Sequence, residues 1–267
     1  MLIENTVFGK INKEELSIQR VLEFKNKSKD NKNIIAFSGG KDSIVLYDIC
    51  KRAGIDMIPT YSPTSVDPPE LINFIRKEYP EVVILPYKKN KNGELMTMWT
   101  LIPYKSMPPT RINRYCCDYF KESTAGNKGD TVFVGVRWEE SNKRKKLSMV
   151  GFWKKKIIVR PLIDWTEEDV WEYIHKYNLK YPSLYDNGWK RIGCIGCPLS
   201  SKNQLRELEL YPKIKANYIR AFDKMVKKRK ELGKHCTWEN GYDVYKWWTG
   251  LIKKDKYSID GQCSLFE

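Results

Sequence analysis

Residues 33–52 read NIIAFSGGKDSIVLYDICKR. The run from Asn33 to Phe37 is apolar and has the length of a strand, and residues 44–52 show the apolar spacing of a helix. Two glycines, flanked by Ser38 and Ser43, lie between them. This order of strand, glycine-rich loop and helix predicts an α/β sheet with a ligand loop at the carboxyl end of its strand.

The remaining sequence repeats this alternation of strands and helices. Apolar runs predict strands at 57–61, 82–85 and 131–136, and helical spacing predicts helices over 12–29, from about residue 68, and over 166–177. We therefore predict an open, mostly parallel twisted sheet with helices on both faces. Residues 90–126 have no clear period and are interpreted as a long functional excursion.

The C-terminal part differs in character from the sheet region. Residues 212–232 form a strongly basic stretch with helical spacing, and Gly233 would cap its end. The predicted domains are a nucleotide-binding domain at 1–200 and a basic helical C-terminal extension at 201–267.

Composition excludes several classes of protein. Of the 267 residues 41% are hydrophobic, which is typical of a globular chain rather than a disordered one. No apolar run approaches the roughly 20 residues that span a bilayer, and the first ten residues lack the apolar core of a secretory signal. We expect a cytoplasmic protein without a membrane partner, whose seven cysteines are thiols or metal ligands rather than disulfides.

The net charge of +15, from 48 Lys and Arg against 33 Asp and Glu, predicts an attraction to anions. Three interpretations stay open: contact with nucleic acid, DNA or tRNA, in which the 212–232 helix would face the nucleic acid; a polyanionic small substrate alone; or a solvated lysine-rich surface.

The loop Ser38-Gly39-Gly40-Lys41-Asp42-Ser43 has the features of a phosphate cradle. The two glycines let the backbone approach an anion, and successive N–H groups at the start of the helix point toward it. The two serines add hydroxyl donors, and the lysine adds a positive charge. Because the loop is not of the Walker type, we do not expect an enzyme that cleaves the terminal phosphate of a nucleoside triphosphate.

This loop resembles the PP-loop of the ATP-pyrophosphatase superfamily, whose members bind ATP and cleave between its α and β phosphates. Over roughly residues 30–200 the chain is similar to the phosphoadenosine phosphosulfate (PAPS) reductase branch. The matching motifs are TSVDPPE at 64–70, GVRWEES at 135–141 followed by Arg144, and RPLIDW at 160–165 leading into DVW at 169–171. The resemblance implies an adenine nucleotide alpha hydrolase-like fold and a site for ATP or an adenylyl sulfonucleotide.

Four further residues are candidates for the nucleotide site. Gly135 and Arg137 follow the predicted strand at 131–136, where a guanidinium could grip a phosphate or sulfate in a bidentate manner. The alternative for Arg137 is a surface ion pair with Glu139 or Glu140. Asp67 and Glu140 could each hold the Mg²⁺ that ATP cleavage requires, or could simply cap a helix.

Two pairs of cysteines form the second candidate site. Cys116-Cys117 and Cys194-x-x-Cys197 could close a tetrahedral sulfur site, for which Zn²⁺ or an iron-sulfur cluster is suitable. An adjacent pair is unusual for structural zinc, and the arrangement resembles the 4Fe-4S site of adenylyl-sulfate reductases. The favoured prediction is therefore 4Fe-4S, with Zn²⁺ and metal-free thiols as alternatives. Neighbouring cations would offset the charge or would form only a solvated face: Arg111, Arg114, Lys121, Lys190 and Arg191. In the first case we predict that cluster and nucleotide share one basic pocket.

The C-terminal region departs from the pattern of sulfonucleotide reductases. Their nucleophilic cysteine lies in a Glu-Cys-Gly-x-His-like signature, whereas Cys263 here lies in DGQCSLFE. Cys263 is thus either a catalytic nucleophile or a tail residue, and the intact loop favours ATP over a sulfonucleotide. Cys50 lies in the apolar pattern of a helix and is predicted to be a core residue.

Three functions follow from these features. The leading hypothesis is an ATP-using, cluster-bearing enzyme that adenylates or thiolates a target, similar to enzymes of DNA phosphorothioation or tRNA thiolation, with a possible sulfur-donor or electron-donor protein. In that mechanism Lys41 stabilises charge as pyrophosphate leaves. The second is a sulfonucleotide reductase in which Cys263 attacks sulfur and sulfite is released. The third is a non-catalytic nucleotide-binding accessory protein.

Overall fold

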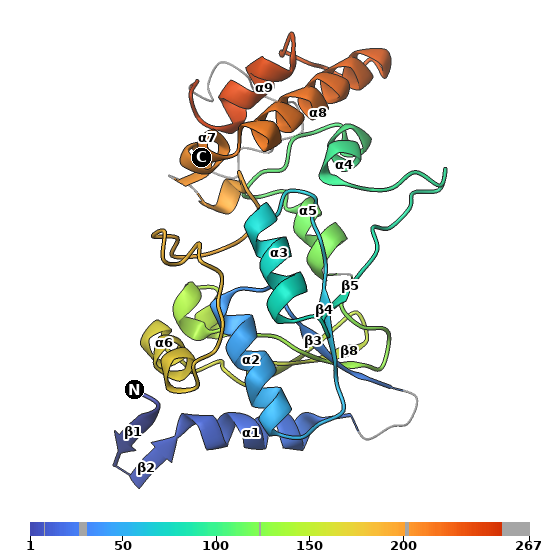
Figure 1. Cartoon of the computed structure of the whole chain (residues 1–267). Helices are drawn as coiled ribbons and strands as arrows, with labels where there is room; N and C mark the ends of the chain where they lie inside the picture. The colour runs from blue at the N-terminus through green and yellow to red at the C-terminus, as the bar shows by residue number, and fades with distance from the viewer. Residues whose placement is uncertain (8, 27–30, 123, 201–202, 253–267) are drawn as a thin grey trace. The chain divides into compact units, whose positions relative to one another are not determined.

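The computed structural model describes the chain except residues 8, 27–30, 123, 201–202 and 253–267 (Figure 1). It contains two compact units. We call residues 1–62, 69–85 and 124–192 the sheet unit, and residues 63–68, 86–123 and 193–267 the helical unit. Each unit is made of several separate stretches of the chain, so the units do not test the predicted domain boundary after residue 200, which stays a prediction.

The sheet unit is built on six strands in the order β5-β4-β3-β6-β8-β7. All neighbouring pairs are parallel except β7 with β8, which is antiparallel. The strands are β3 (Asn33–Ala36), β4 (Ile58–Tyr61), β5 (Val83–Ile84), β6 (Thr131–Phe133), β7 (Val150–Trp153) and β8 (Lys156–Val159). The predicted open, mostly parallel α/β sheet is therefore confirmed, and β3 lies inside it between β4 and β6.

Four helices and an N-terminal hairpin complete the sheet unit. The helices are α1 (Lys13–Phe24), α2 (Lys41–Arg52), α3 (Pro69–Glu78) and α6 (Glu167–Lys176), and the hairpin joins β1 (Ile3–Thr6) to β2 (Gly9–Asn12). Side chains of α1, α2 and α6 share one buried cluster with residues of β3, β6 and β8. Burying this apolar face is what holds these helices to the sheet.

Local sequence fixes where these helices begin. The Asn12 side chain accepts hydrogen bonds from the first turn of α1, and Thr166 accepts one from Asp169 N in α6. These caps satisfy backbone donors that have no partner within a helix. By contrast α2 begins after Gly40, which has no side chain to cap it. The first N–H group of α2, that of Lys41, donates instead to the Tyr185 hydroxyl.

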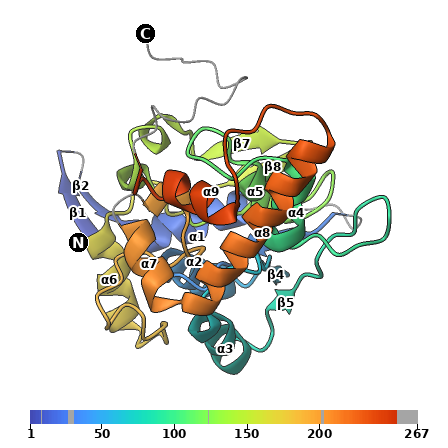
Figure 2. The same ribbon diagram turned by 90° about the horizontal axis from the view of Figure 1, so that it is seen from above.

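The helical unit contains α4 (Met98–Lys105), α5 (Tyr115–Cys117), a π-helical turn (Asp118–Glu122), α7 (Asn203–Leu210), α8 (Pro212–Glu231) and α9 (Gly241–Trp248). Figures 1 and 2 both show α8 alongside α4 and α9, with which it is in contact. Tyr218 and Phe222 of α8 pack on Trp248 with ring centroids 4.7 and 5.3 Å apart. The predicted long helical C-terminal region is confirmed. Within the described ranges, no helix combines the length and hydropathy that a bilayer crossing requires.

Candidate functional site

We call residues 38–43 the phosphate loop, after their predicted role. This loop turns sharply between β3 and α2. Gly39 has a φ of +73°, and a Cβ there would lie 2.7 Å from Leu71 Cδ1. The Ser43 hydroxyl accepts from Ser38 N at 3.1 Å and donates to Gly40 O at 2.8 Å, so the loop is closed on itself. Its geometry therefore needs glycine for the backbone and serine for the internal hydrogen bonds.

Lys41, at the first position of α2, is 5% exposed. Its Nζ lies 3.7 Å from carboxylate oxygens of Asp42 and Glu167 and 3.4 Å from Lys190 O. Its backbone N–H donates to the Tyr185 hydroxyl at 3.0 Å. Burial raises the pKa of Tyr185, so this hydroxyl stays neutral. The ammonium group is thus held beside the loop by two carboxylates and a backbone carbonyl.

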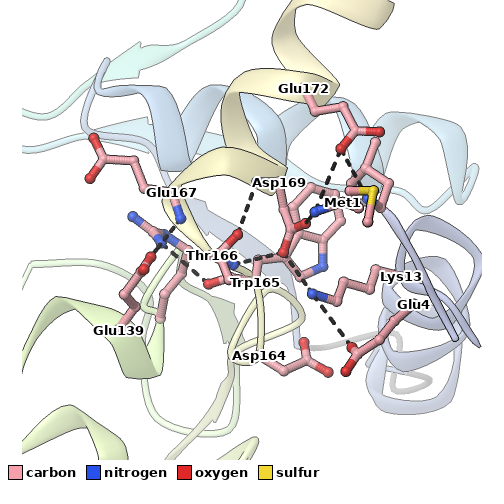
Figure 3. Close-up of polar contacts among 12 residues, drawn as sticks. Met1, Glu4, Lys13, Glu139, Asp164, Trp165, Thr166, Glu167, Asp169 and Glu172 are labelled. Carbon is pink, nitrogen blue, oxygen red and sulfur yellow. Dashed lines mark hydrogen bonds and ion pairs between the residues drawn. The ribbon is translucent and has the colours of Figure 1, made fainter. Parts of the chain in front are cut away.

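Arg137 is 3% exposed and connects the loop to the elements beside it. Its Nε donates to Asp42 Oδ1 at 2.6 Å, and its Nη1 donates to Glu139 Oε2 at 2.9 Å and to Trp165 O at 3.2 Å. Glu139 also accepts from the backbone N–H of Glu167 at 2.5 Å (Figure 3). Arg137 therefore ties the first turn of α2 to the start of α6. An ion pair with Glu139 is present, but the guanidinium is buried rather than at the surface as that alternative expected, and a phosphate contact by Arg137 stays a prediction.

Gly135, two residues beyond β6, lies against the same turn of α2. A Cβ on Gly135 would be 2.8 Å from Asp42 O and 3.3 Å from Ser43 N. These are backbone atoms, so only a glycine permits this close approach of the two segments. The structure thus brings Gly135 and Arg137 to the loop, as the sequence predicted from the strand ends.

The other end of this network contains a buried carboxylate in α6. Asp169 is 0% exposed and accepts from Lys13 Nζ at 2.7 Å, from the Met1 ammonium at 2.5 Å and from Thr166 N at 2.8 Å (Figure 3). Burial acts to raise its pKa, but these hydrogen bonds lower the pKa to about 2. Asp169 stabilises the start of α6, the helix whose Glu167 faces Lys41.

The four predicted cysteine ligands all belong to the helical unit. Cys116 and Cys117 lie in α5, and the turn Cys194–Cys197 is closed by a hydrogen bond from Cys197 N to Cys194 O at 3.3 Å. Helix α7 supports this turn, since Glu207 accepts from Gly196 N at 2.9 Å and Gln204 donates to Gly196 O at 3.1 Å. The two pairs are thus presented by short, braced segments.

The four thiols interact electrostatically with one another. The hydrogen bond from Cys116, with Arg114 and Lys121 acting in the same direction, lowers the pKa of Cys117 to about 5 against the effect of burial. The same hydrogen bond raises the pKa of Cys116, which also interacts with Cys194 and Cys197. The charge of Cys194 raises the pKa of Lys121. The site therefore combines four interacting thiols with two cations.

The donor chemistry fits a thiolate-ligated metal or cluster, since four cysteine sulfurs are suitable ligands for zinc or a 4Fe-4S cluster. In the described part of the chain, no group of three or more His, Cys, Asp and Glu residues stands in ligand geometry. The four thiols interact, and the binding of a metal or cluster by them stays a prediction.

The two candidate Mg²⁺ ligands both accept a local backbone hydrogen bond. Asp67 Oδ2 accepts from Thr64 N at 2.6 Å within the helical unit. Glu140 Oε2 accepts from Arg137 N at 2.8 Å and pairs with the guanidinium of Arg144. The Glu140 contact caps the 3-10 turn at 138–140, whereas the Asp67 contact closes a turn outside any helix, and metal binding by either residue stays a prediction.

Two other cysteines were assigned from sequence. Cys50 is fully buried in the core cluster of the sheet unit, which confirms its predicted role. Cys263 lies outside the described residues, and both of its roles stay predictions. Tyr185 and Glu167, which contact Lys41, were not predicted.

Comparison with known proteins gives a consistent family. The phosphoadenosine phosphosulfate reductase domain matches residues 32–200. An uncharacterized protein of Methanocaldococcus jannaschii is 31% identical over 215 residues, or 77% of this chain and 51% of that protein, so the chain spans about half of its length. The adenosine 5'-phosphosulfate reductase of Anoxybacillus flavithermus is 29% identical over 191 residues, 65% of this chain and 76% of that protein. Among solved structures, PAPS reductase from Candida auris in a phosphate complex has a TM-score of 0.46 at 17% identity, covering 69% of this chain and 88% of that one.

Proposed function

Because the chain belongs to the phosphoadenosine phosphosulfate reductase domain family, we propose that it is a PP-loop enzyme that binds ATP or a related adenylyl nucleotide. The reaction we propose is adenylation or thiolation of a target such as nucleic acid. The observation that supports it is the closed loop 38–43 at the uncapped start of α2, with the buried Lys41 beside it. An anion at this point receives backbone N–H groups and a lysine ammonium together.

The proposed chemistry uses the loop as an electrostatic stabiliser. A nucleophile on the target attacks the α-phosphorus of ATP, a bond to the acceptor forms, and the bond to the β-phosphate oxygen breaks. The electron pair leaves with pyrophosphate, whose charge Lys41 and the loop amides stabilise. Arg137 holds Asp42 and thereby the first turn of α2 in the required orientation.

The four cysteines are the proposed ligands of a 4Fe-4S cluster, with Zn²⁺ as the alternative. A bound cluster would supply a site for sulfur or electron transfer. In the chain itself Arg114 and Lys121 would offset the negative charge of the thiolates. That this group and the nucleotide share one basic pocket stays a prediction.

One observation favours a second function. Curated relatives such as that of Anoxybacillus flavithermus are named adenosine 5'-phosphosulfate reductases. A sulfonucleotide reductase, with Cys263 attacking sulfur and a thiol donor releasing sulfite, is therefore the alternative. A non-catalytic nucleotide-binding accessory protein is the third candidate.

The test is to incubate anaerobically purified protein with ATP and Mg²⁺, and separately with adenylyl sulfate, with tRNA or duplex DNA present as acceptor. The proposal expects pyrophosphate and AMP or an adenylylated product from ATP. Lys41→Ala should abolish this release, whereas Lys51→Ala, at the exposed far end of the same helix, should retain it. Sulfite from adenylyl sulfate without pyrophosphate would establish the reductase instead. ATP binding without any turnover would indicate the accessory protein.

A further inference from the structure

The helix α8 carries cations of two kinds. The first kind is engaged with the rest of the helical unit: Lys215 lies 5.3 Å from the ring of Tyr245, Lys228 lies 5.6 Å from that of Tyr104, and Arg229 Nη1 donates to Ser106 O at 2.8 Å. These contacts are explained by the packing of α8 against its neighbours.

Lys230 is also exposed, but it donates to Glu239 O at 3.3 Å. The second kind consists of the four remaining exposed cations, Lys213, Arg220, Lys224 and Lys227. At 3.6 residues per turn they fall within about 60° of arc around the helix, on the side opposite its buried residues. The row is about 21 Å long, from a rise of about 1.5 Å per residue. We call it the cation row.

No acidic side chain neutralises the cation row in the described part of the chain. Within the described residues, these four cations make one polar contact, from Arg220 to the Asn217 side chain, and no ion pair. Asp223, three residues after Arg220 and four before Lys227, lies at the edge of this face and accepts from the backbone N–H of Gly241. Glu231 lies one turn beyond Lys227, where the row ends. Four like charges held together on a rigid helix repel one another, and a polyanion would relieve that repulsion.

We propose that the cation row is a docking surface for the phosphate backbone of a double-helical nucleic acid. The row is straight and repeats its charge over a length that spans several phosphates of one strand. It carries no aromatic side chain on which an unpaired base could stack, and the nearby Tyr104 ring is already faced by Lys228. These features fit contacts to phosphates without readout of bases. This inference rests on the proposed function, because it names the class of the target.

The test measures binding of a 30-base-pair DNA duplex as a function of salt, without ATP. The row variant carries Lys213→Gln, Arg220→Gln, Lys224→Gln and Lys227→Gln, and the matched control carries Gln at four exposed lysines of the sheet unit, Lys10, Lys51, Lys128 and Lys145. Both variants lose the same charge. If all four cations contact phosphates, the slope of log affinity against log salt should weaken by about 3.6 in the row variant only. Over a fourfold rise in salt this is about a 150-fold difference in the loss of affinity.

Further arms separate the alternatives. A variant with Arg in place of Lys213, Lys224 and Lys227 keeps the charges and should bind as the unaltered protein does. Equal slopes for the row variant and the control, or no binding of duplex at 50 mM salt, would overturn the proposal. A slope change seen with single-stranded DNA but not with duplex would overturn the assignment to a double helix. ATP affinity should be unchanged in the row variant, so a failure here is distinguishable from a failure of the ATP chemistry.

Discussion

Replacing Gly135 by alanine would test how the end of β6 positions the phosphate loop. The added Cβ would lie 2.8 Å from Asp42 O, 3.0 Å from Asp42 C and 3.3 Å from Ser43 N. All three are backbone atoms of the first turn of α2, so no side-chain rotation relieves the contact. Gly135 does not have a positive φ, and the cost of the substitution is therefore steric rather than conformational.

The magnitude follows from that geometry. Overpacking a close contact costs about 1–3 kcal/mol, and we expect the free energy of unfolding to fall by that amount. Part of the strain can be relieved by a shift of α2 by a few tenths of an ångström, which also moves the loop amides away from a bound phosphate. Because misplacements of about 1 Å cost about 100-fold in function, we expect ATP affinity to fall by about tenfold.

Gly54→Ala is the matched control, because Gly54 follows the other end of the same helix. Its φ is +63° and no atom lies within 4 Å of the added Cβ, so alanine there costs about 1–2 kcal/mol of backbone strain without moving the loop. Urea denaturation and calorimetric titration with ATP should be measured on both variants. The reasoning is refuted if Gly135→Ala binds ATP as tightly as the unaltered chain, or if both variants lose affinity equally.

Three other substitutions have defined outcomes. Arg137→Lys keeps the charge but cannot make the three hydrogen bonds of the guanidinium, so urea denaturation should show a loss of about 2 kcal/mol, and a loss below about 0.5 kcal/mol would contradict this. For Asp169 the pKa of about 2 lies below the unfolded value of 3.8, so its stabilisation of about 2 kcal/mol is present above pH 4 and is lost as the pH falls through 2. Asp169→Asn should therefore be less stable than the unaltered chain at pH 6, and this difference in stability should shrink between pH 4 and 2. A difference that does not change with pH would contradict the lowered pKa of Asp169. Cys194→Ser should remove the iron and the visible absorbance of anaerobically purified protein, whereas Cys236→Ser should retain both.

The fold was largely predictable because its strands and helices have strong local patterns. Residues 33–37 were predicted as a strand and form β3 at 33–36. The next helix was predicted from residue 44, where the apolar period begins, but α2 begins at Lys41, because the loop itself supplies the first turn. The hairpin of β7 and β8 was missed, since its turn at Lys154 and Lys155 adopts positive φ without glycine or asparagine.

The candidate site was predictable only where its residues are close in sequence or share a motif. The loop 38–43 and the two cysteine pairs were found in this way. The partners of Lys41 were not, because Tyr185 lies 144 residues away and its position depends on tertiary packing. Likewise Asp42 is 95 residues from Arg137, so their hydrogen bond could not be derived from spacing.

Hydrogen exchange of the loop amides is the most direct test of the phosphate cradle. The peptide covering residues 38–43 should exchange more slowly when ATP and Mg²⁺ are added to the anaerobically purified protein, and Lys41→Ala should weaken this protection. Saturating ATP that protects other segments while the exchange of residues 38–43 stays unchanged would contradict the assignment of this loop.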